Sequence, residues 1–210
     1  MARSLDLRLI VITDRRLAAP RELRDIAAAA LAAGAPVLQV RDKDADAREL
    51  LQLCDTLVPL ARLHAARILV NDRLDVALAA GSDGVHLGPD DLPVDAARRV
   101  VPPGFLIGWS TDDPDDARTA ERAGADYIGC GAVFGTTTKA EAADERIGVD
   151  RLDEVARAVS IPVVGIGGIT PDNIAAVAAT HAAGAAVVSA VMAAPEPGDA
   201  VRRLLAAFAR

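Results

Sequence analysis

Short aliphatic segments alternate with alanine-rich amphipathic segments along the whole chain. Eight of the aliphatic segments have the length and nearly continuous apolar character of strands buried on both faces. They lie at residues 9–12, 37–40, 68–70, 85–87, 105–107, 127–128, 163–166 and 186–188. Stretches of helical period follow them at residues 21–33, 45–63, 74–80, 94–100, 113–123, 151–159, 172–179 and 199–209. Strict alternation predicts a parallel sheet, and eight units with no segment left over predict a closed (β/α)8 TIM barrel.

The length of the chain agrees with this fold. The chain has 210 residues, close to the lower limit of about 200 for such barrels, so we expect one compact domain over residues 1–210 with almost no insertions. The rival fold is a doubly wound open sheet, which normally carries a glycine-rich phosphate loop after its first strand. The sequence there is Thr13-Asp14-Arg15-Arg16, without glycine. The barrel is therefore the favoured prediction.

Composition excludes several classes of function. The formal net charge is -7 and no broad basic stripe occurs, so a nucleic-acid surface is not expected. Aromatic residues make up only 2% of the chain, which disfavours stacking on single strands. No apolar stretch reaches the roughly 18–20 residues of a membrane helix, and two cysteines cannot form a disulfide scaffold. We expect a cytoplasmic protein that binds neither nucleic acid nor membrane.

In a barrel, the residues at the carboxyl ends of the strands should carry the chemistry. Polar residues are concentrated at these ends, whereas the amino ends of the same strands are mostly small, apolar or helix-capping. The polar segments begin, in strand order, at Gln39, Asn71, Gly88, Ser110, Gly135, Gly165 and Val188. This asymmetry is the strongest functional signal that the residues give by themselves.

A phosphate site is predicted after the seventh strand. Gly167 and Gly168 would let backbone N–H groups approach an anion, and the start of the next helix would add a favourable dipole. In barrels, the loops after the last two strands often hold a phosphate. The alternative is a tight strand-to-helix turn without a ligand.

A pair of carboxylates is predicted at the ends of the third and fourth strands. Asp72 and Asp91 would face one cavity, and Mg²⁺ typically takes one or two carboxylates plus substrate phosphate oxygens. The alternative is that either aspartate caps the next helix. Because Asp90 and Asp91 both precede Pro93, we expect one of them to be a cap, and spacing alone does not choose between them.

The same rim carries cations and hydroxyl groups, which belong to Arg41, Lys43, Lys139, Ser110, Thr136, Thr137 and Thr138. Arg41 and Lys43 lie on one side of an extended segment because side chains alternate there. A forked guanidinium and a point ammonium together suit a diphosphate. The alternative for any one cation is a solvated surface charge. Together with the carboxylates and the phosphate turn, the cations predict ionisation of a diphosphate leaving group, with its charge neutralised by metal and cations.

Residues 135–150 lack a strong apolar period. A connection this long often acts as a lid, and a lid would exclude water from a reactive intermediate. A flexible acidic loop is the alternative for residues 141–145.

Six motifs together resemble those of the thiamine phosphate synthase family, in the family's order and spacing, from about Leu7 to the C-terminus. They are QVRDK at 39–43, NDR at 71–73, GVHLGPDD at 84–91, ADYIG at 125–129, TTTK at 136–139 and GIGGI at 165–169. The resemblance implies a (β/α)8 transferase that joins hydroxymethylpyrimidine diphosphate to a thiazole phosphate, or its carboxylated form, with Mg²⁺ required. The products would be thiamine phosphate and pyrophosphate. Diphosphate would leave first, and the thiazole nitrogen would capture the pyrimidine cation.

The resemblance also implies roles position by position. Pyrimidine diphosphate contacts are implied for Gln39, Val40, Arg41, Asp42, Lys43, Asn71, Ser110 and Lys139. Thiazole phosphate contacts are implied for Thr136, Thr137, Thr138, Gly168, Val188 and Ser189. Asp72 and Asp91 are implied as the magnesium ligands, which settles the choice that spacing left open. The residues expected to carry catalysis are Arg41, Lys43, Ser110 and Lys139. The partners expected are the two small-molecule substrates, and a homodimer is compatible with this interpretation.

The chain departs from the family pattern at four positions. Pro89 stands where Gln is usual, and Asp112 where His or Asn is common. Trp109 replaces a small aliphatic residue, and Cys130 stands where an aliphatic residue is usual. We interpret Trp109 as a packing residue. The diphosphate and metal groups are intact, so the departures concern the finer detail of the pyrimidine pocket.

Three rival functions make different demands on the residues. The thiazole tautomerase branch of the superfamily needs no magnesium or diphosphate cations, which are present here, and uses a His near the position of Asp112. A non-catalytic phosphate-binding barrel would need only the glycine turn. A phosphosugar isomerase would need an acid–base pair, but the first strand ends only in Asp14, and His86, within a strand, is interpreted as a core residue.

Overall fold

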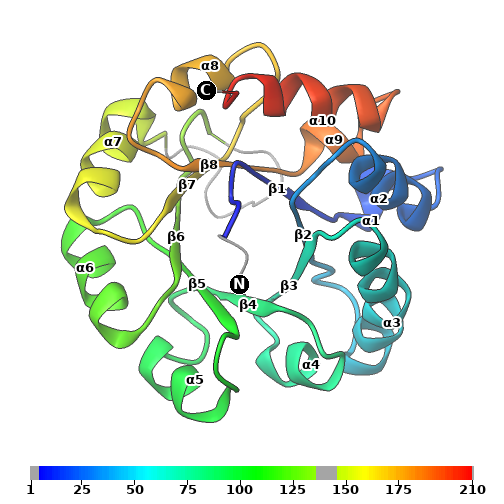
Figure 1. The fold of residues 1–210 in the computed structure, drawn as a ribbon, viewed down its shortest axis with the longest axis horizontal. Helices are drawn as coiled ribbons and strands as arrows, with labels where there is room; N and C mark the ends of the chain where they lie inside the picture. Colours follow the sequence, from blue (N-terminus) through cyan, green and yellow to red (C-terminus); the bar gives the residue numbers. More distant parts are fainter. Residues whose placement is uncertain (1–4, 136–145, 210) are drawn as a thin grey trace.

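The computed structural model describes residues 5–135 and 146–209. Within these ranges eight parallel strands form a closed barrel in chain order, and β8 pairs with β1. The strands are β1 Leu9–Ile12, β2 Val37–Val40, β3 Arg67–Asn71, β4 Gly84–Leu87, β5 Leu106–Ser110, β6 Tyr127–Cys130, β7 Val163–Ile166 and β8 Gly184–Val187. Figure 1 looks down the barrel and shows the helices as an outer ring. The prediction of a (β/α)8 barrel is confirmed.

Eight helices of the described chain correspond to the predicted ones. They are α2 Leu23–Ala32, α3 Ala47–Leu63, α4 Leu74–Ala79, α5 Val94–Val100, α6 Pro114–Ala123, α7 Gly148–Ala158, α8 Ile174–Ala178 and α10 Pro197–Ala206. Two further helices of four residues, α1 Arg15–Ala18 and α9 Ser189–Met192, were not predicted. One turn of helix is too short to show a period in the sequence. Both lie at the carboxyl end of the barrel, directly after β1 and β8.

Some strands differ in extent from their prediction. The fifth strand runs on to Ser110 and the sixth to Cys130, because Ser110 and Gly129 pair across the two strands although neither is a large apolar residue. The eighth strand begins earlier, at Gly184, which pairs with Val164. Hydrogen bonding to neighbouring strands thus extends the sheet beyond the apolar segments. As a result, Ser110 stands on the last residue of a strand.

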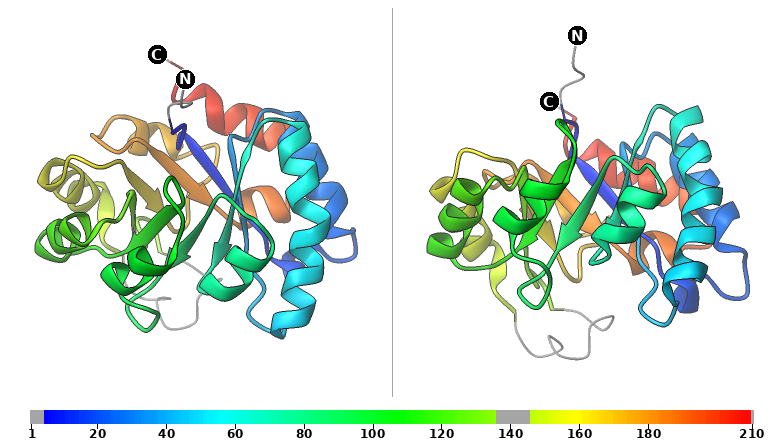
Figure 2. Two further views of the ribbon diagram at one scale, coloured as in Figure 1. Left: turned by 60° about the horizontal axis from the view of Figure 1, so that its bottom comes forward. Right: turned by 90° about the horizontal axis from the view of Figure 1, so that it is seen from below.

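Two apolar layers surround the strands. The larger layer lies between the strands and the helices, where alanines such as Ala27 and Ala61 are fully buried and let the helices approach closely. The smaller layer fills the inside of the barrel and includes Ile10, Leu69 and Tyr127. Figure 2 shows from two sides that the helices flank the strands, and that β1 starts and α10 ends at the same end of the barrel. The barrel interior is thus a packed core, above which a site can open.

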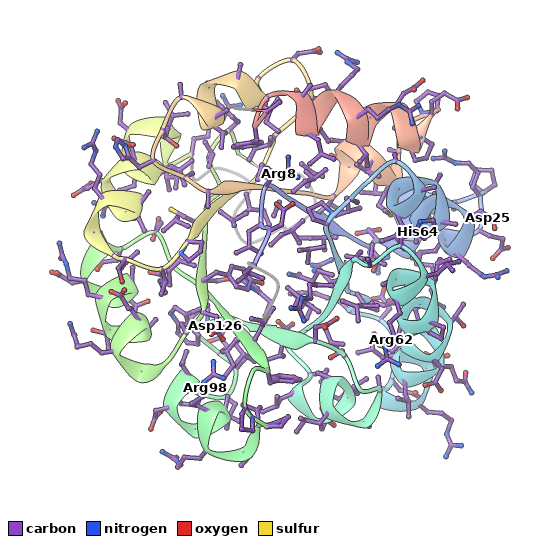
Figure 3. All side chains as sticks on the ribbon, viewed as in Figure 1. Arg8, Asp25, Arg62, His64, Arg98 and Asp126 are labelled. Atoms are coloured by element: carbon purple, nitrogen blue, oxygen red, sulfur yellow. The ribbon has the colours of Figure 1, made fainter. Side chains whose placement is uncertain are left out.

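Two aspartates connect neighbouring strands at the amino end of the barrel. Asp126 accepts the N–H of Ile107 at 2.7 Å and Nη2 of Arg98 at 2.5 Å. Arg98 also donates to the carbonyl oxygens of Gly124 and Phe105, both at 2.7 Å. Figure 3 shows Arg98 and Asp126 in the same sector of the barrel. The guanidinium therefore joins α5 to the loops that precede β5 and β6.

Asp83 repeats this arrangement two βα units earlier in the barrel. It precedes β4, accepts the N–H of Ile68 at 2.8 Å, and accepts Nη1 of Arg67 at 2.9 Å. In both cases a carboxylate replaces a missing ladder partner at the start of a strand, and an arginine compensates its charge. The polar groups of this end serve stability, in contrast to those of the opposite end.

We predict that Arg98→Met lowers the free energy of unfolding by about 2 kcal/mol, since it leaves a partly buried carboxylate and two carbonyls without their charged donor. Arg99→Met is the matched control, because Arg99 forms only an exposed pair with Asp95, which should contribute well under 1 kcal/mol. Urea denaturation of the two variants measures the difference. Equal stability of the two variants would contradict the assignment.

Candidate active site

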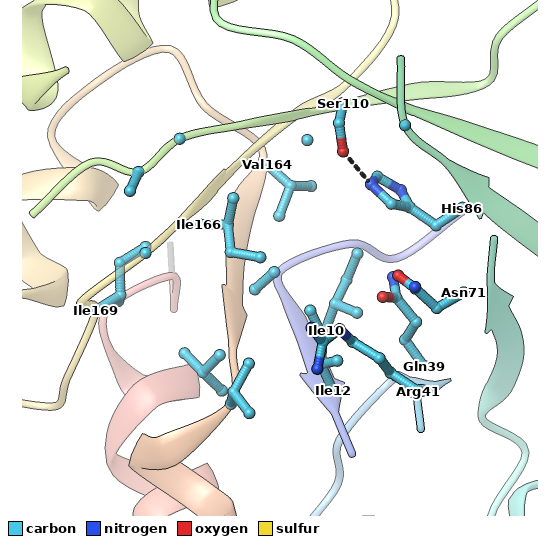
Figure 4. A pocket seen from close by; sticks show the side chains of 18 of the residues that line it. Ile10, Ile12, Gln39, Arg41, Asn71, His86, Ser110, Val164, Ile166 and Ile169 are labelled. Carbon is cyan, nitrogen blue, oxygen red and sulfur yellow. Dashed lines mark hydrogen bonds between the residues drawn. The ribbon is translucent and has the colours of Figure 1, made fainter. Parts of the chain in front are cut away.

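A cavity of about 550 Å³ opens at the carboxyl ends of the strands, and every strand or its following loop contributes to the lining. Its two sides differ in chemistry, as Figure 4 shows. A polar wall comes from β2 to β5 and carries Gln39, Arg41, Asn71, His86 and Ser110. An apolar wall comes from β7 and the loop after it, and carries Val164, Ile166 and Ile169. The cavity can therefore hold a polar group against one wall and an apolar group against the other.

Alternation along 39–43 decides which side chains face the cavity. Gln39, Arg41 and Lys43 line it, as the spacing predicted for the two cations. Val40 is fully buried and is not among the lining residues. Asp42 is not among them either: its side chain is only 6% exposed, and its Oδ2 lies 2.9 Å from Nε of Arg15. Arg41 and Lys43 thus face the cavity, whereas the side chains of Val40 and Asp42 do not.

Asp72 and Asp91 come together beside the cations. Asp72 follows β3 in a left-handed conformation, with φ 62°, and lines the cavity. Burial raises the pKa of Asp72 to about 6, and the adjacent carboxyl of Asp91, in hydrogen-bonding contact, adds to the rise, while Lys43 and Arg41 oppose it. Strained backbone and a raised pKa in one residue are typical of functional positions. Asp72 and Asp91 are thus in contact at the ends of neighbouring strands, and their role as metal ligands stays a prediction.

One expectation about this segment was wrong. Neither Asp90 nor Asp91 caps α5, whose N-cap is Pro93 without a side-chain hydrogen bond. Asp91 instead accepts the N–H of Gly88 at 2.7 Å through Oδ2. This bond folds the loop after β4 back on itself and directs the carboxylate toward Asp72. The loop thus holds the carboxylate of Asp91 against Asp72, which lines the cavity.

The carboxylate pair suits a hard cation that also takes oxygen ligands from a substrate. No group of three or more His, Cys, Asp or Glu side chains with metal-binding geometry occurs in the described part of the chain. Two carboxylates are nevertheless sufficient for Mg²⁺, which usually keeps several waters or phosphate oxygens as its other ligands. Asp72 and Asp91 fit this requirement.

A row of hydrogen bonds crosses the floor of the cavity. The hydroxyl of Tyr127 lies 2.8 Å from Nδ1 of His86, and Nε2 of His86 lies 2.8 Å from Oγ of Ser110; Figure 4 marks the second bond. Gly129 makes room for the imidazole, since a Cβ there would lie 2.9 Å from Cε1 of His86. Burial raises the pKa of Tyr127 far above its usual range, so the phenol keeps its proton. The row therefore holds Ser110 in place.

The interpretation of His86 as a core residue needs correction, because its ring lines the cavity. One signal in the sequence could have indicated this, and a second becomes visible only in the register of the sheet. His86 lies two residues before Gly88, so both point to the same side of the strand and its extension. In the sheet, His86 pairs with Gly108, and Gly108 pairs with Tyr127. A glycine between two large polar rings marks a place where side chains cross the inside of the barrel.

The glycine turn after β7 lies at the edge of the cavity. Gly167 and Gly168 both have positive φ, at 100° and 64°. Asn173 holds the turn: its Nδ2 donates to the carbonyl of Gly168 at 2.9 Å, and its Oδ1 accepts the N–H of Thr170 at 2.8 Å. Ser189, the first residue of α9, lines the cavity as well. The turn and α9 thus form one edge of the cavity.

Several predicted site residues lie outside the described residues. They are Thr136, Thr137, Thr138 and Lys139, together with residues 140–145 of the predicted lid. Gly135 and Arg146, at the two ends of this segment, line the cavity.

The residues that depart from the family pattern fall into two groups. Pro89 and Asp112 line the cavity and can affect the shape of its polar side. Trp109 donates from Nε1 to Asp116 at 2.9 Å and packs against the core, as interpreted from the sequence. Cys130 is fully buried, and burial raises the pKa of its thiol to about 12. Only the first group can contact a ligand.

A parallel barrel with cations, paired carboxylates and a glycine turn at the carboxyl ends of its strands defines a TIM-barrel enzyme that acts on phosphorylated small molecules. The sequence model of one such family, described as thiamine monophosphate synthase, matches residues 9–191. The chain belongs to the thiamine monophosphate synthase family.

Individual relatives agree with this assignment. The thiamine-phosphate synthase of Roseiflexus castenholzii is 49% identical over 194 residues, which cover 92% of this chain and 85% of that protein. The enzyme of the same name from Natronomonas pharaonis is 44% identical over 200 residues, with coverages of 95% and 94%. Among solved structures, a thiamine phosphate pyrophosphorylase from Pyrococcus furiosus matches with a TM-score of 0.88, 41% identity and coverages of 97% and 96%.

More distant structures share the fold alone. A 3-hexulose-6-phosphate synthase matches with a TM-score of 0.72 at 16% identity. In the described residues of this chain, no helix combines the length and apolar character needed to span a membrane.

Proposed function

We propose that this protein is a thiamine phosphate synthase, which joins hydroxymethylpyrimidine diphosphate to a thiazole phosphate and releases thiamine phosphate and pyrophosphate. The observation that carries the proposal is that Arg41, Lys43 and Asp72 line one cavity, with Asp91 in contact with Asp72 behind it. Cations beside a metal-binding carboxylate pair suit a leaving diphosphate, which an isomerase or a simple phosphate-binding barrel would not need. Family membership supports the same reaction.

Arg41 and Lys43 are placed to bind the diphosphate. Departure of this group breaks the bond between the pyrimidine methylene carbon and the bridging oxygen, and the electron pair leaves with the diphosphate. The forked guanidinium can bind two oxygens at once, and the ammonium adds a point charge. Asp72 and Asp91 would hold Mg²⁺, which supplies further neutralisation of the developing charge when bound. Lys139, outside the described residues, is proposed as a third cation.

The polar wall is placed to hold the pyrimidine. Gln39 and Asn71 offer amide donors and acceptors, and Ser110 offers a hydroxyl that His86 holds in position. These groups can recognise ring nitrogens and an exocyclic amine by hydrogen bonds. Because burial keeps Tyr127 neutral, the floor of the cavity adds no negative charge that would trap the cation. The pyrimidine ring can therefore be oriented by hydrogen bonds without a phenolate nearby that would react with the cation.

The apolar wall and the glycine turn are placed to hold the thiazole phosphate. Ile166 and Ile169 can pack against the ring, and Gly168 and Ser189 line the same cavity. The backbone N–H groups of Gly168 and Ser189 are proposed to donate to the phosphate oxygens. Val188 lines the same edge, and Thr136 to Thr138 are proposed to join it. The thiazole nitrogen then supplies the electron pair that forms the new carbon–nitrogen bond. The apolar surroundings exclude water that would compete for the cation.

Product formation tests the function. The purified chain is incubated with both substrates and Mg²⁺, and thiamine phosphate is measured after separation from the substrates. We expect product only when both substrates are present, and loss of product when a chelator removes the metal. Binding of thiazole phosphate without any product would instead favour the non-catalytic barrel, and tautomerisation of a carboxylated thiazole would favour the tautomerase branch.

The free, buried cysteines Cys54 and Cys130 are compatible with the proposed cytoplasmic location.

We predict that affinity for Mg²⁺ falls as the pH drops through about 6, since a proton on Asp72 competes with the metal and its pKa is raised to about 6. In the metal-free protein the sign is different: the raised pKa stabilises the fold at low pH, and this contribution is lost as the pH rises from about 4 to about 6. The melting temperature should therefore rise with Mg²⁺ at neutral pH and not at about pH 5. Asp90→Asn, which changes the neighbouring exposed carboxylate, should behave as wild type. An equal shift at both pH values would contradict the prediction.

A further inference from the structure

The segment after β1 contacts the cation-bearing segment after β2. Arg15 pairs with Asp42 at 2.9 Å and Arg16 pairs with Asp44 at 2.7 Å. The arginine side chains of these pairs are 59% and 80% exposed, so the pairs contribute little by themselves. Closer to the barrel, the contacts with Arg41 are buried. These inner contacts come from Thr13 and Asp14.

Thr13 holds the backbone of Arg41. It is fully buried, and its Oγ1 accepts the N–H of Arg41 at 2.8 Å and donates to the carbonyl oxygen of Arg41 at 3.0 Å. The last regular pair of the two strands is Ile12 with Gln39, and the N–H of Thr13 bonds to the carbonyl of Gln39 at 2.9 Å. One hydroxyl therefore continues the sheet beyond its last regular pair and engages both backbone groups of Arg41.

Asp14 faces the guanidinium of the same residue. Its Oδ1 accepts the N–H of Leu17 at 3.0 Å and so caps α1, which fixes the carboxyl group. Its Oδ2 lies 3.8 Å from Nη1 of Arg41, and the two side chains are only 15% and 16% exposed. A carboxylate held by a helix cap thus orients the guanidinium from one side. Arg41 itself lines the cavity, so the guanidinium oriented in this way can bind a ligand there.

We propose that Thr13 and Asp14 are positioning residues for Arg41. The hydroxyl sets the backbone of Arg41, and the carboxylate sets the direction of its guanidinium. Neither residue is among those that line the cavity, so they act through Arg41 and not on the substrate. The proposal rests on the proposed function, in which Arg41 binds the diphosphate. It assigns a role to the segment at the end of β1, which otherwise supplies no acid–base pair.

Two variants of Thr13 separate positioning from packing. Thr13→Val keeps the shape and removes the hydroxyl, whereas Thr13→Ser keeps the hydroxyl and removes a methyl group. We expect Thr13→Val to raise KM for the pyrimidine diphosphate about tenfold or more and to lower kcat, because the N–H of Arg41 loses its acceptor. KM for the thiazole phosphate should change by less than about twofold. Thr13→Ser should retain wild-type kinetics even if its melting temperature falls. A packing role requires the reverse order of the two variants, and that order would overturn the proposal.

Asp14→Asn provides a second measurement that does not depend on the folding of the first variants. Asparagine caps a helix as well as aspartate does, so α1 should persist while the charge beside Arg41 is lost. We expect a severalfold rise in KM for the pyrimidine diphosphate alone. Arg16→Gln is the matched control, because it removes an exposed charge of the same segment, and its kinetics should equal those of wild type. Kinetics of Asp14→Asn indistinguishable from this control would overturn the role of the carboxylate.

Binding of inorganic pyrophosphate distinguishes failure of this proposal from failure of the proposed function. Calorimetric titration with pyrophosphate and Mg²⁺ reports on the cation site without turnover. Thr13→Val should bind pyrophosphate about tenfold more weakly than Thr13→Ser. If wild type makes no thiamine phosphate but this difference is found, the proposed reaction fails and the positioning role stands. If wild type is active and the two variants bind pyrophosphate equally, the positioning role fails alone.

Discussion

Asp72→Asn is expected to lower kcat/KM for thiamine phosphate formation by about 10³-fold or more, because a neutral amide is a poor ligand for the cation that neutralises the leaving diphosphate. The fold should be retained. Asp72 has a φ of 62°, and asparagine tolerates the left-handed region better than most residues. The substitution also removes the repulsion between two adjacent carboxylates, which contributes to the raised pKa of Asp72. The melting temperature of the metal-free variant should therefore equal or exceed that of wild type.

Loss of activity without loss of stability is the result that identifies a functional carboxylate. The assay is steady-state product formation over a range of Mg²⁺ concentrations, together with melting curves with and without Mg²⁺. Asp90→Asn is the matched control, since Asp90 is an exposed neighbour of Asp91 in the same loop, and it should keep wild-type activity. A wild-type rate for Asp72→Asn would exclude Asp72 as a ligand.

The barrel was predictable because its information is local and periodic. Strands covered on both faces are short apolar segments, helices have an apolar stripe, and strict alternation leaves few topologies. The cation pair was predictable for the same reason: Arg41 and Lys43 are two residues apart in an extended segment, so they must face the same side. The residues between them illustrate the limit of a resemblance. It implies contacts for all of 39–43, whereas the fold turns Val40 and Asp42 away from the cavity.

Contacts between distant segments were not predictable in this way. His86 and Tyr127 approach each other because a glycine on the intervening strand leaves space inside the barrel, and this depends on the register of three strands. Thr13 reaches Arg41 across 28 positions of the chain. The helix caps depend on single hydrogen bonds, and the helices α1 and α9 consist of a single turn each. Such features have no period, so a sequence pattern does not contain them.

The structure also shows why whole-chain charge is a poor guide to the ligand. The net charge is -7, and many acidic groups pair with arginines on the outside, such as Asp95 with Arg99 and Asp115 with Arg118. In the cavity, Arg41 and Lys43 stand near Asp72, which contacts Asp91, and a metal would neutralise the charge of these two carboxylates. The net charge around the cavity therefore depends on whether a metal is bound to the two carboxylates. A diphosphate that arrives with its metal supplies this neutralisation, which leaves Arg41 and Lys43 to bind its oxygens.

Gly168→Ala is expected to raise KM for the thiazole phosphate by about 10²-fold, the scale of effect that a shift of about 1 Å in a binding group produces. A Cβ at this position would lie 2.7 Å from the carbonyl oxygen of Gly135 and 3.0 Å from Cβ of Phe134. These contacts are too short, so the turn must move, and the N–H group proposed to bind the phosphate must move with it. KM for the pyrimidine diphosphate should change by less than about twofold, because the polar wall lies on the other side of the cavity.

Gly104→Ala is the matched control for the backbone penalty. Gly104 also has a positive φ, of 82°, but a Cβ there would meet nothing within 4 Å. Both variants pay the cost of a side chain in the left-handed region, about 1 kcal/mol, and only Gly168→Ala displaces its neighbours. Initial rates with each substrate varied in turn give the two KM values. Equal losses for both substrates, or the same kinetics in the two variants, would show that the turn after β7 does not bind the thiazole phosphate.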